Sequence, residues 1–241
     1  MGKTSIYCCY HKPIQKTQYP NEDVIWIYGP SHQLNGYFNE LTMFKYIYET
    51  DKDSQYIGCC HYRRQFHLKD IDYDYLDDDH CITLNRRINP EQCTDRYGSI
   101  RWWSNPKWQD CEFLYFDFLD YIRTKDDYLK YYHADEFCYE HQCFYARNCF
   151  IMNRFHFFKL CEHIGGFYDY IDKKYELNHD HRKYYDFLKN YKNTCGKITE
   201  QGWFNNGAMR LFGYMGELLT SNYIVANFNL DNVKYLNDNI V

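Results

Sequence analysis

Short apolar runs in the first third of the chain predict buried strands. Residues 5–10 and 23–28 are rich in β-branched and aromatic side chains, and a proline follows each run closely. Residues 55–60 form a third apolar run, and between the last two runs apolar side chains recur at helical spacing over residues 39–50. The order strand, strand, helix, strand predicts a mainly parallel sheet with helical crossovers, and we expect the first two strands to be interior.

Helical spacing dominates the rest of the chain, so we expect an α/β fold with a helix-rich C-terminal half flanking the sheet. Residues 85–110 are rich in tryptophan and contain two prolines, which predicts an irregular but ordered insertion in a single domain of residues 1–241. The further helices are expected at 112–123, from 124 onward, and at 155–174, 181–191 and 207–219, and the further strands at 81–84, 143–152 and 223–228.

The composition narrows the class of protein. The chain has 241 residues, of which 45% are hydrophobic, so it has ample material for a core. Its 28 basic and 33 acidic residues leave a net charge of −5, which gives no general attraction to nucleic acid. No uncharged apolar run approaches the ~18 to 20 residues that span a bilayer, so we expect membrane contact to be peripheral at most. The 12 cysteines include no C-x-x-C pair and follow no signal peptide, which favours reduced thiols in the cytoplasm.

A basic cluster directly follows the third apolar run. His61, Arg63 and Arg64 lie where the strand is expected to end, and ligands of open α/β sheets bind outside the carboxyl ends of strands. Arginine matches phosphate oxygens in pairs, and a histidine adds a hydrogen-bonding group. The cluster therefore predicts an anion site. The alternative is a solvated strand end whose arginines pair with nearby aspartates.

An acidic segment follows at residues 69–79. Asp72 and Asp74 belong to Asp-x-Asp pairs, which can hold Mg²⁺ or Mn²⁺ against a diphosphate. A solvated acidic loop or helix edge is the alternative. No Walker-type loop, G-x-G-x-x-G or G-x-S-x-G is present, which lowers the odds of P-loop nucleotide hydrolysis, dinucleotide redox chemistry and α/β-hydrolase chemistry.

Five sequence blocks, in order, resemble a known family, the capsular and exopolysaccharide synthesis proteins regarded as GT-A-like glycosyltransferases. The family pattern of a strand running into His-Lys-Pro is similar to IYCCYHKP at 6–13, and its Glu-Leu-Thr helix to NELT at 39–42. Its most specific signature resembles YIGCCHYRR at 56–64. The last two blocks resemble NCFIM at 148–152 and RLFGYMGELL at 210–219.

The resemblance covers nearly the whole chain and has two departures. Cys149 replaces a methionine of the fourth block, and Gly216-Glu217-Leu218 replaces Ser-Glu-Arg in the last, which removes an arginine. Small residues around Gly216 are also explained by close helix packing. What the resemblance implies is a GT-A-like fold and a hexosyltransferase that passes a sugar from a nucleotide-sugar donor to a glycan acceptor in polysaccharide synthesis.

The implied reaction assigns provisional roles to residues. Negative charge develops on the departing diphosphate, and cations are needed where it develops. We expect His61, Tyr62, Arg63 and Arg64 to meet the diphosphate, with or without Mn²⁺ or Mg²⁺ held by Asp72 and Asp74. The further donor-binding candidates are His11, Lys12, Glu40, Asn148 and Arg210.

Transfer with inversion also needs a carboxylate base for the acceptor hydroxyl, and Glu217 is the leading candidate, followed by Asp72 or Asp74. Each assignment has a structural alternative: Glu217 and Arg210 share a helix face and can pair with buried polar groups, while Glu40 can stabilise its helix terminus.

Two other functions stay open at this level. One is a catalytically inactive relative that binds glycans or serves a structural role. The other is a nucleotide-sugar phosphohydrolase, which would release sugar phosphate without an acceptor.

Overall fold

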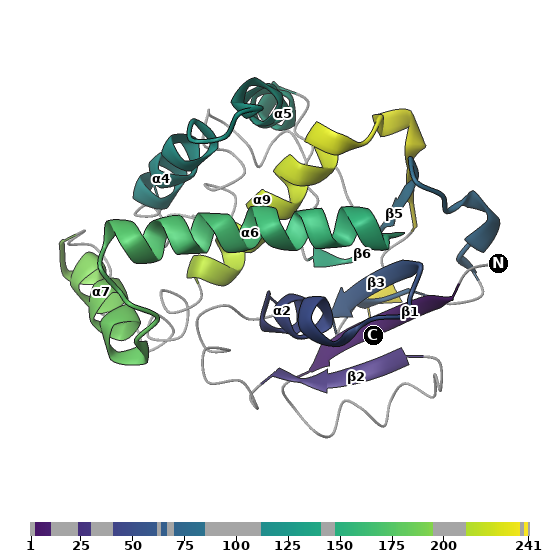
Figure 1. Cartoon of the computed structure of the whole chain (residues 1–241), viewed down its shortest axis with the longest axis horizontal. Helices are drawn as coiled ribbons and strands as arrows, with labels where there is room; N and C mark the ends of the chain where they lie inside the picture. The colour runs from purple at the N-terminus through teal and green to yellow at the C-terminus, as the bar shows by residue number, and fades with distance from the viewer. Residues whose placement is uncertain are drawn as a thin grey trace.

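The computed structural model describes most of the sheet and its covering helices (Figure 1). The described residues are 3–10, 24–29, 41–61, 64–66, 70–84, 112–140, 148–194, 211–236 and 239–240. Within them the predicted α/β class is confirmed: strands dominate the first third of the chain and helices the second half.

The central sheet has the strand order β2-β1-β3-β6-β5-β7, and only β6 runs against the others. Two short strands, β4 and β8, pair with each other, and β4 also pairs with the end of β3. The strand bounds are β1 Thr4–Tyr10, β2 Val24–Tyr28, β3 Tyr56–His61, β4 Arg64–Gln65, β5 Cys81–Thr83, β6 Phe150–Asn153, β7 Val233–Tyr235 and β8 Asn239–Ile240.

The helices gather on one side of the strands in Figure 1, with α6 crossing the centre of the molecule between α2 and the α4 and α5 pair. Helices α5 and α9 contact each other, and α6 contacts α2, α4 and α9. The helix bounds are α2 Leu41–Thr50, α4 Glu112–Ile122, α5 Tyr128–Glu140, α6 Arg154–Lys174, α7 His181–Thr194 and α9 Leu211–Asn227, with short 3-10 turns η4 Tyr73–Tyr75 and η7 Leu230–Asn232.

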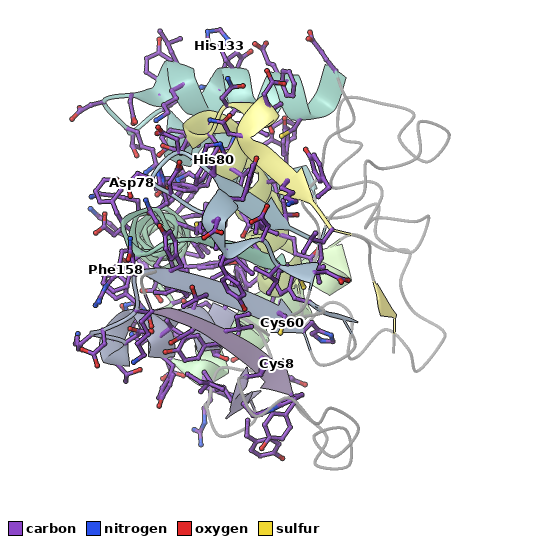
Figure 2. All side chains as sticks on the ribbon, turned by 90° about the vertical axis from the view of Figure 1, so that its right-hand side faces the viewer. Cys8, Cys60, Asp78, His80, His133 and Phe158 are labelled. Atoms are coloured by element: carbon purple, nitrogen blue, oxygen red, sulfur yellow. The ribbon has the colours of Figure 1, made fainter. Side chains whose placement is uncertain are left out.

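Side chains of the central strands alternate between two buried clusters, one on each face of the sheet. Ile57 and Cys59 of β3 join the cluster beneath α2, α6 and α9. Tyr56 and Cys60 join the opposite cluster, which also contains Cys8 of the neighbouring strand β1 (Figure 2). Because both faces are covered, β1 and β3 show continuous apolar runs rather than alternation.

Gly58 lets β3 pack closely between its neighbours. A Cβ at this position would lie 3.0 Å from a side-chain carbon of Ile6 and 3.1 Å from one of Ile151. Both isoleucines are buried on adjacent strands, so the glycine of the YIG signature has a packing role.

Polar groups at both ends of α6 hold it in place. Asn153 caps its start by accepting a hydrogen bond of 2.7 Å from the backbone N–H of His156. At its end, Lys174 pairs with the buried Asp117 of α4, and Tyr175 donates a hydrogen bond of 2.8 Å to the same carboxylate. This ion pair ties α6 to α4 across the helical layer.

Three element predictions are wrong in part. Residues 223–228 do not form a strand, because α9 continues to Asn227 and buries Tyr223 and Ile224. Packing overrides their β propensity. The strand that pairs with β5 at this end of the chain is β7 instead. Within the described sheet, strand β2 lies at the edge rather than in the interior, and Ile25 is 44% exposed. The strand predicted at 143–152 starts only at Phe150 in the described residues.

The short strands β4, β7 and β8 were not predicted, while the other predicted elements that fall on described residues match to within a few residues. The largest difference is α5, which begins at Tyr128 after a turn. The insertion predicted at 85–110 lies outside the described residues. Among the helices that the structure describes, none is both long enough and apolar enough to cross a bilayer.

Candidate functional site

One edge of the sheet collects the carboxyl ends of its parallel strands. Strand β1 ends at Tyr10, β3 at His61 and β5 at Thr83, and the pairing register brings these ends to the same side. The antiparallel strand β6 starts at this edge with Phe150, opposite Cys59 and Thr83. We call this the carboxyl edge. It is where ligands bind in open α/β sheets.

His61 is the last residue of β3 and is only 6% exposed. Alternation along the strand puts its side chain on the same face as Ile57 and Cys59, the face covered by α2, α6 and α9. The chain then folds back, and Arg64 pairs with His61 in an antiparallel bridge. The strand has therefore ended before the two arginines, so simple alternation does not apply across them.

Asn148 lies beside this strand end and precedes β6. Continuing the register of β3 and β6, in which Cys59 pairs with Phe150, sets Asn148 opposite His61. Its backbone adopts the left-handed conformation, with φ of 50°, which asparagine tolerates better than most residues. Its side chain is 1% exposed, so the segment entering β6 is firmly placed in the interior.

The hydrogen bonds of Asn148 are incomplete. The Thr220 hydroxyl lies 2.7 Å from Asn148 Oδ1 and 2.8 Å from the carbonyl oxygen of Gly216, and its single hydrogen can serve only one of them at a time. The Nδ2 group of Asn148 has no hydrogen-bond partner within the described part of the chain. A buried amide without a partner is costly in a scaffold and useful where a polar ligand binds.

Glu217 belongs to the same face of α9 as Thr220, because residues three apart are neighbours on a helix. It is 8% exposed, and Ser221 donates a hydrogen bond of 2.8 Å to its backbone carbonyl. Thr220 therefore links the helix that carries Glu217 to Asn148. Of the predicted site residues, His61 and Asn148 thus lie side by side at the carboxyl edge, and Glu217 lies one turn away from Thr220 on the helix that contacts Asn148.

The departures in the last block have a packing explanation. A Cβ on Gly216 would lie 2.5 Å from the Cδ1 atom of Leu41, so glycine lets the start of α2 pack closely against α9. Leu218, where the family pattern has arginine, is 2% exposed in the core beneath the helices. Cys149, the other departure, is buried in the opposite cluster.

The predicted carboxylates of the acidic segment lie elsewhere. Lys234 Nζ donates to Asp72 Oδ2 at 3.1 Å, and this hydrogen bond holds the pKa of Asp72 below its usual value. Lys234 pairs in register with Ile82, whose side chain belongs to the cluster away from the helices. Asp72 therefore lies over the opposite face of the sheet from Glu217, and Asp74 is exposed beside it.

The acidic segment does not gather metal ligands within the described residues. No group of three or more His, Cys, Asp or Glu side chains there is arranged to hold an ion. Further along the segment, Asp78 accepts a hydrogen bond of 3.0 Å from Asn153 at the amino end of the parallel strands, far from His61 in the register. This contact and the ion pair of Asp72 indicate a structural role.

Several predicted donor-binding residues lie outside the described part of the chain. Only the backbone of Arg64 is described, as the first residue of β4. Those outside are His11, Lys12, Glu40, Tyr62, Arg63 and Arg210. They stay predictions from the sequence.

A buried polar cluster that was not predicted follows Glu217 on α9. Thr220, Ser221 and Asn222 are consecutive and each is at most 1% exposed, inside an otherwise apolar helix. Asn222 donates a hydrogen bond of 2.8 Å to the carbonyl of Tyr131 on α5. Three successive polar residues in an apolar helical segment were the available signal, but the predicted helix stopped at residue 219.

The described cysteines are structural thiols. None of the eight forms a disulfide within the described part of the chain, and seven of them are buried. The pKa of the Cys60 thiol is raised mainly by a hydrogen bond with Cys8 and also by burial. Burial raises the pKa values of the Cys59 and Cys81 thiols. Because the thiolate is the nucleophile, these groups are poorly suited to covalent catalysis.

Comparison with known proteins supports the fold. No protein-family model matches the sequence, and no curated protein matches it significantly. A solved structure with a similar fold is that of WbbM, described as a bifunctional glycosyltransferase in its apo form. The two share 15% sequence identity with a TM-score of 0.58, over 99% of this chain and 45% of WbbM. The chain thus spans less than half of WbbM and has a glycosyltransferase-like fold.

Proposed function

We propose that this protein is a glycosyltransferase that moves a sugar from a nucleotide-sugar donor to a glycan acceptor, as in capsular and exopolysaccharide synthesis. The observation that carries the proposal is the buried Asn148 beside His61 at the carboxyl edge of a glycosyltransferase-like fold, linked through Thr220 to the helix of Glu217. The motif resemblance across residues 6–219 supports the same assignment. The free thiols among the described cysteines favour a reducing compartment such as the cytoplasm.

The donor would lie across the carboxyl edge with its diphosphate next to the end of β3. In this proposal His61, Arg63 and Arg64 face the phosphate oxygens and stabilise the charge that grows as the sugar leaves. The buried amide of Asn148 donates to a sugar hydroxyl or a phosphate oxygen, which gives its Nδ2 group the partner that it lacks in the described residues.

Glu217 would act as the general base. The acceptor hydroxyl oxygen attacks the anomeric carbon of the donor sugar and loses its proton to the Glu217 carboxylate. The bond from the anomeric carbon to the phosphate oxygen breaks, and its electron pair leaves with the nucleoside diphosphate. This step yields the extended glycan and the diphosphate without any further reactant.

A divalent cation held by Asp72 and Asp74 stays a prediction from the sequence. Asp72 is engaged by Lys234, so the proposal assigns the diphosphate charge first to the basic residues that follow β3. Assays with and without Mn²⁺ or Mg²⁺ test the prediction directly. Chelator-resistant activity would remove the metal from the reaction.

The test of the function is incubation with a panel of nucleotide sugars, with and without Mn²⁺, followed by product analysis. We expect slow donor hydrolysis to free sugar and nucleoside diphosphate, and transfer when a suitable glycan is added. Release of sugar phosphate without an acceptor would instead identify a phosphohydrolase. Silence with every donor, together with no thermal shift by nucleoside diphosphates, would favour an inactive glycan-binding relative.

Substitution of the arginines tests the donor site. If either guanidinium bonds to the diphosphate, Arg63→Ala or Arg64→Ala should weaken nucleoside diphosphate binding by about 1.5 to 3 kcal/mol. Lys52→Ala, at an exposed position beyond the other end of the parallel strands, is a charge-matched control and should leave the affinity unchanged. Equal affinity in both arginine variants and the wild type would remove the pair from the site.

A further inference from the structure

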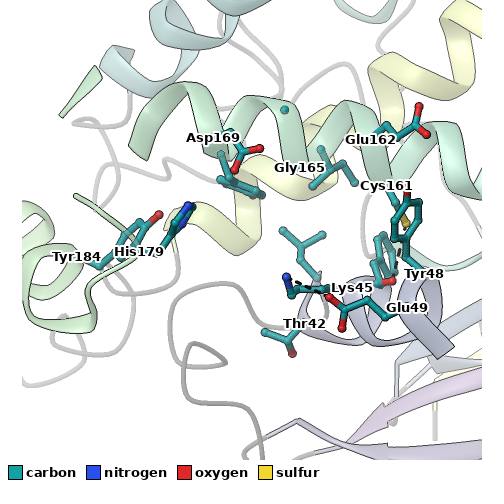
Figure 3. Close-up of a pocket in the computed structure, with 15 residues that line it drawn as sticks. Thr42, Lys45, Tyr48, Glu49, Cys161, Glu162, Gly165, Asp169, His179 and Tyr184 are labelled. Carbon is teal, nitrogen blue, oxygen red and sulfur yellow. Dashed lines mark hydrogen bonds and ion pairs between the residues drawn. The ribbon is translucent and has the colours of Figure 1, made fainter. Parts of the chain in front are cut away.

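A pocket of about 780 Å³ lies between α2 and the second half of α6 (Figure 3). Thr42, Lys45 and Glu49 of α2 border it on one side and Gly165 and Asp169 of α6 on the other, while residues of the α6–α7 turn and α7 close one end. Its volume is within the range of small-ligand sites, about 300 to 1,000 Å³. None of the roles assigned above uses it.

Gly165 keeps the α6 wall of this pocket open. A Cβ at Gly165 would meet no atom of another described segment within 4 Å, whereas a Cβ at the next residue, Gly166, would lie 2.6 Å from the hydroxyl of Tyr121. Gly166 is therefore required by packing and Gly165 is not. Glycine in the middle of a helix costs about 0.5 to 1 kcal/mol relative to alanine, so the open wall at Gly165 is maintained at the expense of stability.

The chemistry of the lining favours an uncharged polyol. Tyr48 is exposed and offers a flat apolar surface beside polar groups, while Tyr168 and Tyr184 line the pocket as largely buried rings. Tyr168 and Tyr184 have their hydroxyls engaged, to the carbonyl of Phe212 and to Asp172, so their rings are held in place.

The charges around the pocket oppose an anion. Among the described residues that line it, Glu49, Glu162 and Asp169 stand against one lysine, Lys45, which pairs with Glu49 at 3.2 Å. Carboxylates accept hydrogen bonds from hydroxyl groups but repel phosphates. The pocket therefore does not suit a nucleotide-sugar donor, whereas neutral sugar units match both its rings and its acceptors.

The pocket is next to the helix turn that carries the proposed base. Leu41 lines the pocket, and the same side chain packs on Gly216, the residue before Glu217. One leucine side chain thus lies between the pocket and the backbone of α9 at Glu217. A glycan seated in the pocket is on the helical side of the sheet, as are His61 and Glu217.

We propose that this pocket binds neutral sugar units of the glycan acceptor, adjacent to the unit whose hydroxyl is activated by Glu217. The inference rests on the proposed function and adds to it a second subsite, separate from the donor diphosphate. Donor and acceptor are thereby sorted by charge: the diphosphate by the basic segment after β3 and the neutral glycan by the acidic, tyrosine-lined pocket.

Filling the pocket tests the proposal without disturbing the donor site. Wild type, Gly165→Ala and Gly165→Leu are applied to an array of neutral and uronic-acid oligosaccharides, and the affinity for the best neutral ligand is then measured by calorimetry. We expect the wild type to retain neutral oligosaccharides. The affinity of Gly165→Ala should lie within about threefold of the wild-type affinity. The affinity of Gly165→Leu should be at least about tenfold weaker, a change of about 1.4 kcal/mol.

Stability and donor hydrolysis supply the controls. Both Gly165 variants should melt at or above the wild-type temperature and keep its rate of donor hydrolysis, while Gly166→Ala should melt lower because it displaces Tyr121. Equal oligosaccharide affinity in Gly165→Leu and the wild type, or retention of no neutral oligosaccharide by the wild type, would overturn the pocket assignment even if donor hydrolysis is present. Loss of oligosaccharide binding in Gly165→Leu without donor hydrolysis in any variant would support the pocket and refute the transferase.

Discussion

The two ends of the parallel strands differ in how their buried polar groups are satisfied. At the amino end, side chains of β1 and of the turn after α2 bond to one another, and Arg154 of α6 donates to a backbone carbonyl of that turn. At the carboxyl edge, His61, Asn148 and Glu217 are equally buried, yet Asn148 keeps an amide group without a partner within the described residues. The amino end is a satisfied hydrogen-bond network, whereas the carboxyl edge keeps a buried donor that can bind a polar ligand.

Asp51 is the centre of the amino-end network. Its carboxylate accepts hydrogen bonds from the hydroxyls of Tyr7 and Ser54, both at 2.6 Å, and from the backbone N–H groups of Asp53 and Ser54. Arg154 at the start of α6 donates to the carbonyls of Asp51 and Lys52. With its carboxylate and its carbonyl both engaged, Asp51 has a structural role: it fixes the turn from α2 into β3 and the start of α6.

The two ends of the strands are expected to serve different purposes, stability at the amino end and activity at the carboxyl edge, and substitutions test this division. Changes at the amino end should lower the free energy of unfolding and leave binding intact. Changes at the carboxyl edge should do the reverse.

The largest expected effect is on catalysis. Glu217→Gln keeps the size of the side chain and removes the base, so transfer should fall by about 10² to 10⁴-fold while the melting temperature stays close to that of the wild type. Transferase and thermal unfolding assays measure both. Glu136→Gln on α5, a partly exposed glutamate near His133, is the matched control and should keep full activity. Full activity in Glu217→Gln would exclude it as the base.

The next effect is on stability at the amino end. Asp51→Ala leaves several buried donors without their acceptor, so the free energy of unfolding should fall by about 3 to 4 kcal/mol. Urea unfolding measures the change. Asp53→Ala is the control, because its exposed carboxylate has only a 4.0 Å contact with Lys3 and should contribute less than about 0.5 kcal/mol. A loss of donor affinity in folded Asp51→Ala would contradict the division between the two ends.

A smaller effect is expected at Asn148. Asn148→Gly removes the amide but suits the left-handed backbone, so stability should change by about 1 kcal/mol or less while nucleotide-sugar affinity falls about tenfold. Calorimetric titration and urea unfolding measure the two quantities. Asn148→Ala adds a Cβ in the same conformation and should be less stable than Asn148→Gly. Unchanged affinity in both variants would give Asn148 a purely structural role.

The smallest effect is on the pH dependence of stability. Burial alone would raise the pKa of Asp51, but hydrogen bonds from Ser54 and Tyr7 outweigh it, and the pKa lies below its usual value. A carboxyl whose pKa is lower in the folded state than the unfolded value of about 3.9 stabilises the fold above that pH and loses this contribution as the pH falls through the folded pKa. Urea unfolding of wild type and Asp51→Asn should therefore show a stability difference at pH 5 that shrinks below about pH 4. A pH-independent difference would contradict the shift.

Much of the fold could be predicted because burial imposes a pattern on each element. Strands β1 and β3 are covered on both faces and therefore have continuous apolar runs, and α6 carries apolar residues at helical spacing over 21 residues. The wrong element predictions arose where contacts with distant segments decide the structure. The same apolar pattern fits an edge strand such as β2, and Tyr223 and Ile224 are helical because α9 packs them into the core.

The candidate site was predictable in its residue types but not in its assembly. The motif around His61 and the positions of Asn148 and Glu217 were recognised from the chain alone. Asn148 lies beside His61 because Cys59 pairs with Phe150, and it is linked to the helix of Glu217 because Thr220 contacts Asn148. Asp72 was predicted beside them and lies over the opposite face, because its place depends on Lys234, more than 150 residues away.

The amino-acid order by itself determined most of the strands and helices, since local periodicity and side-chain size act between near neighbours. Strand order, the helical state of Tyr223 and Ile224, the placing of Asn148 beside His61 and the open wall at Gly165 were decided by tertiary structure. These features depend on contacts between residues far apart in the chain, and the free energy of such contacts depends on the whole packed arrangement rather than on any one segment.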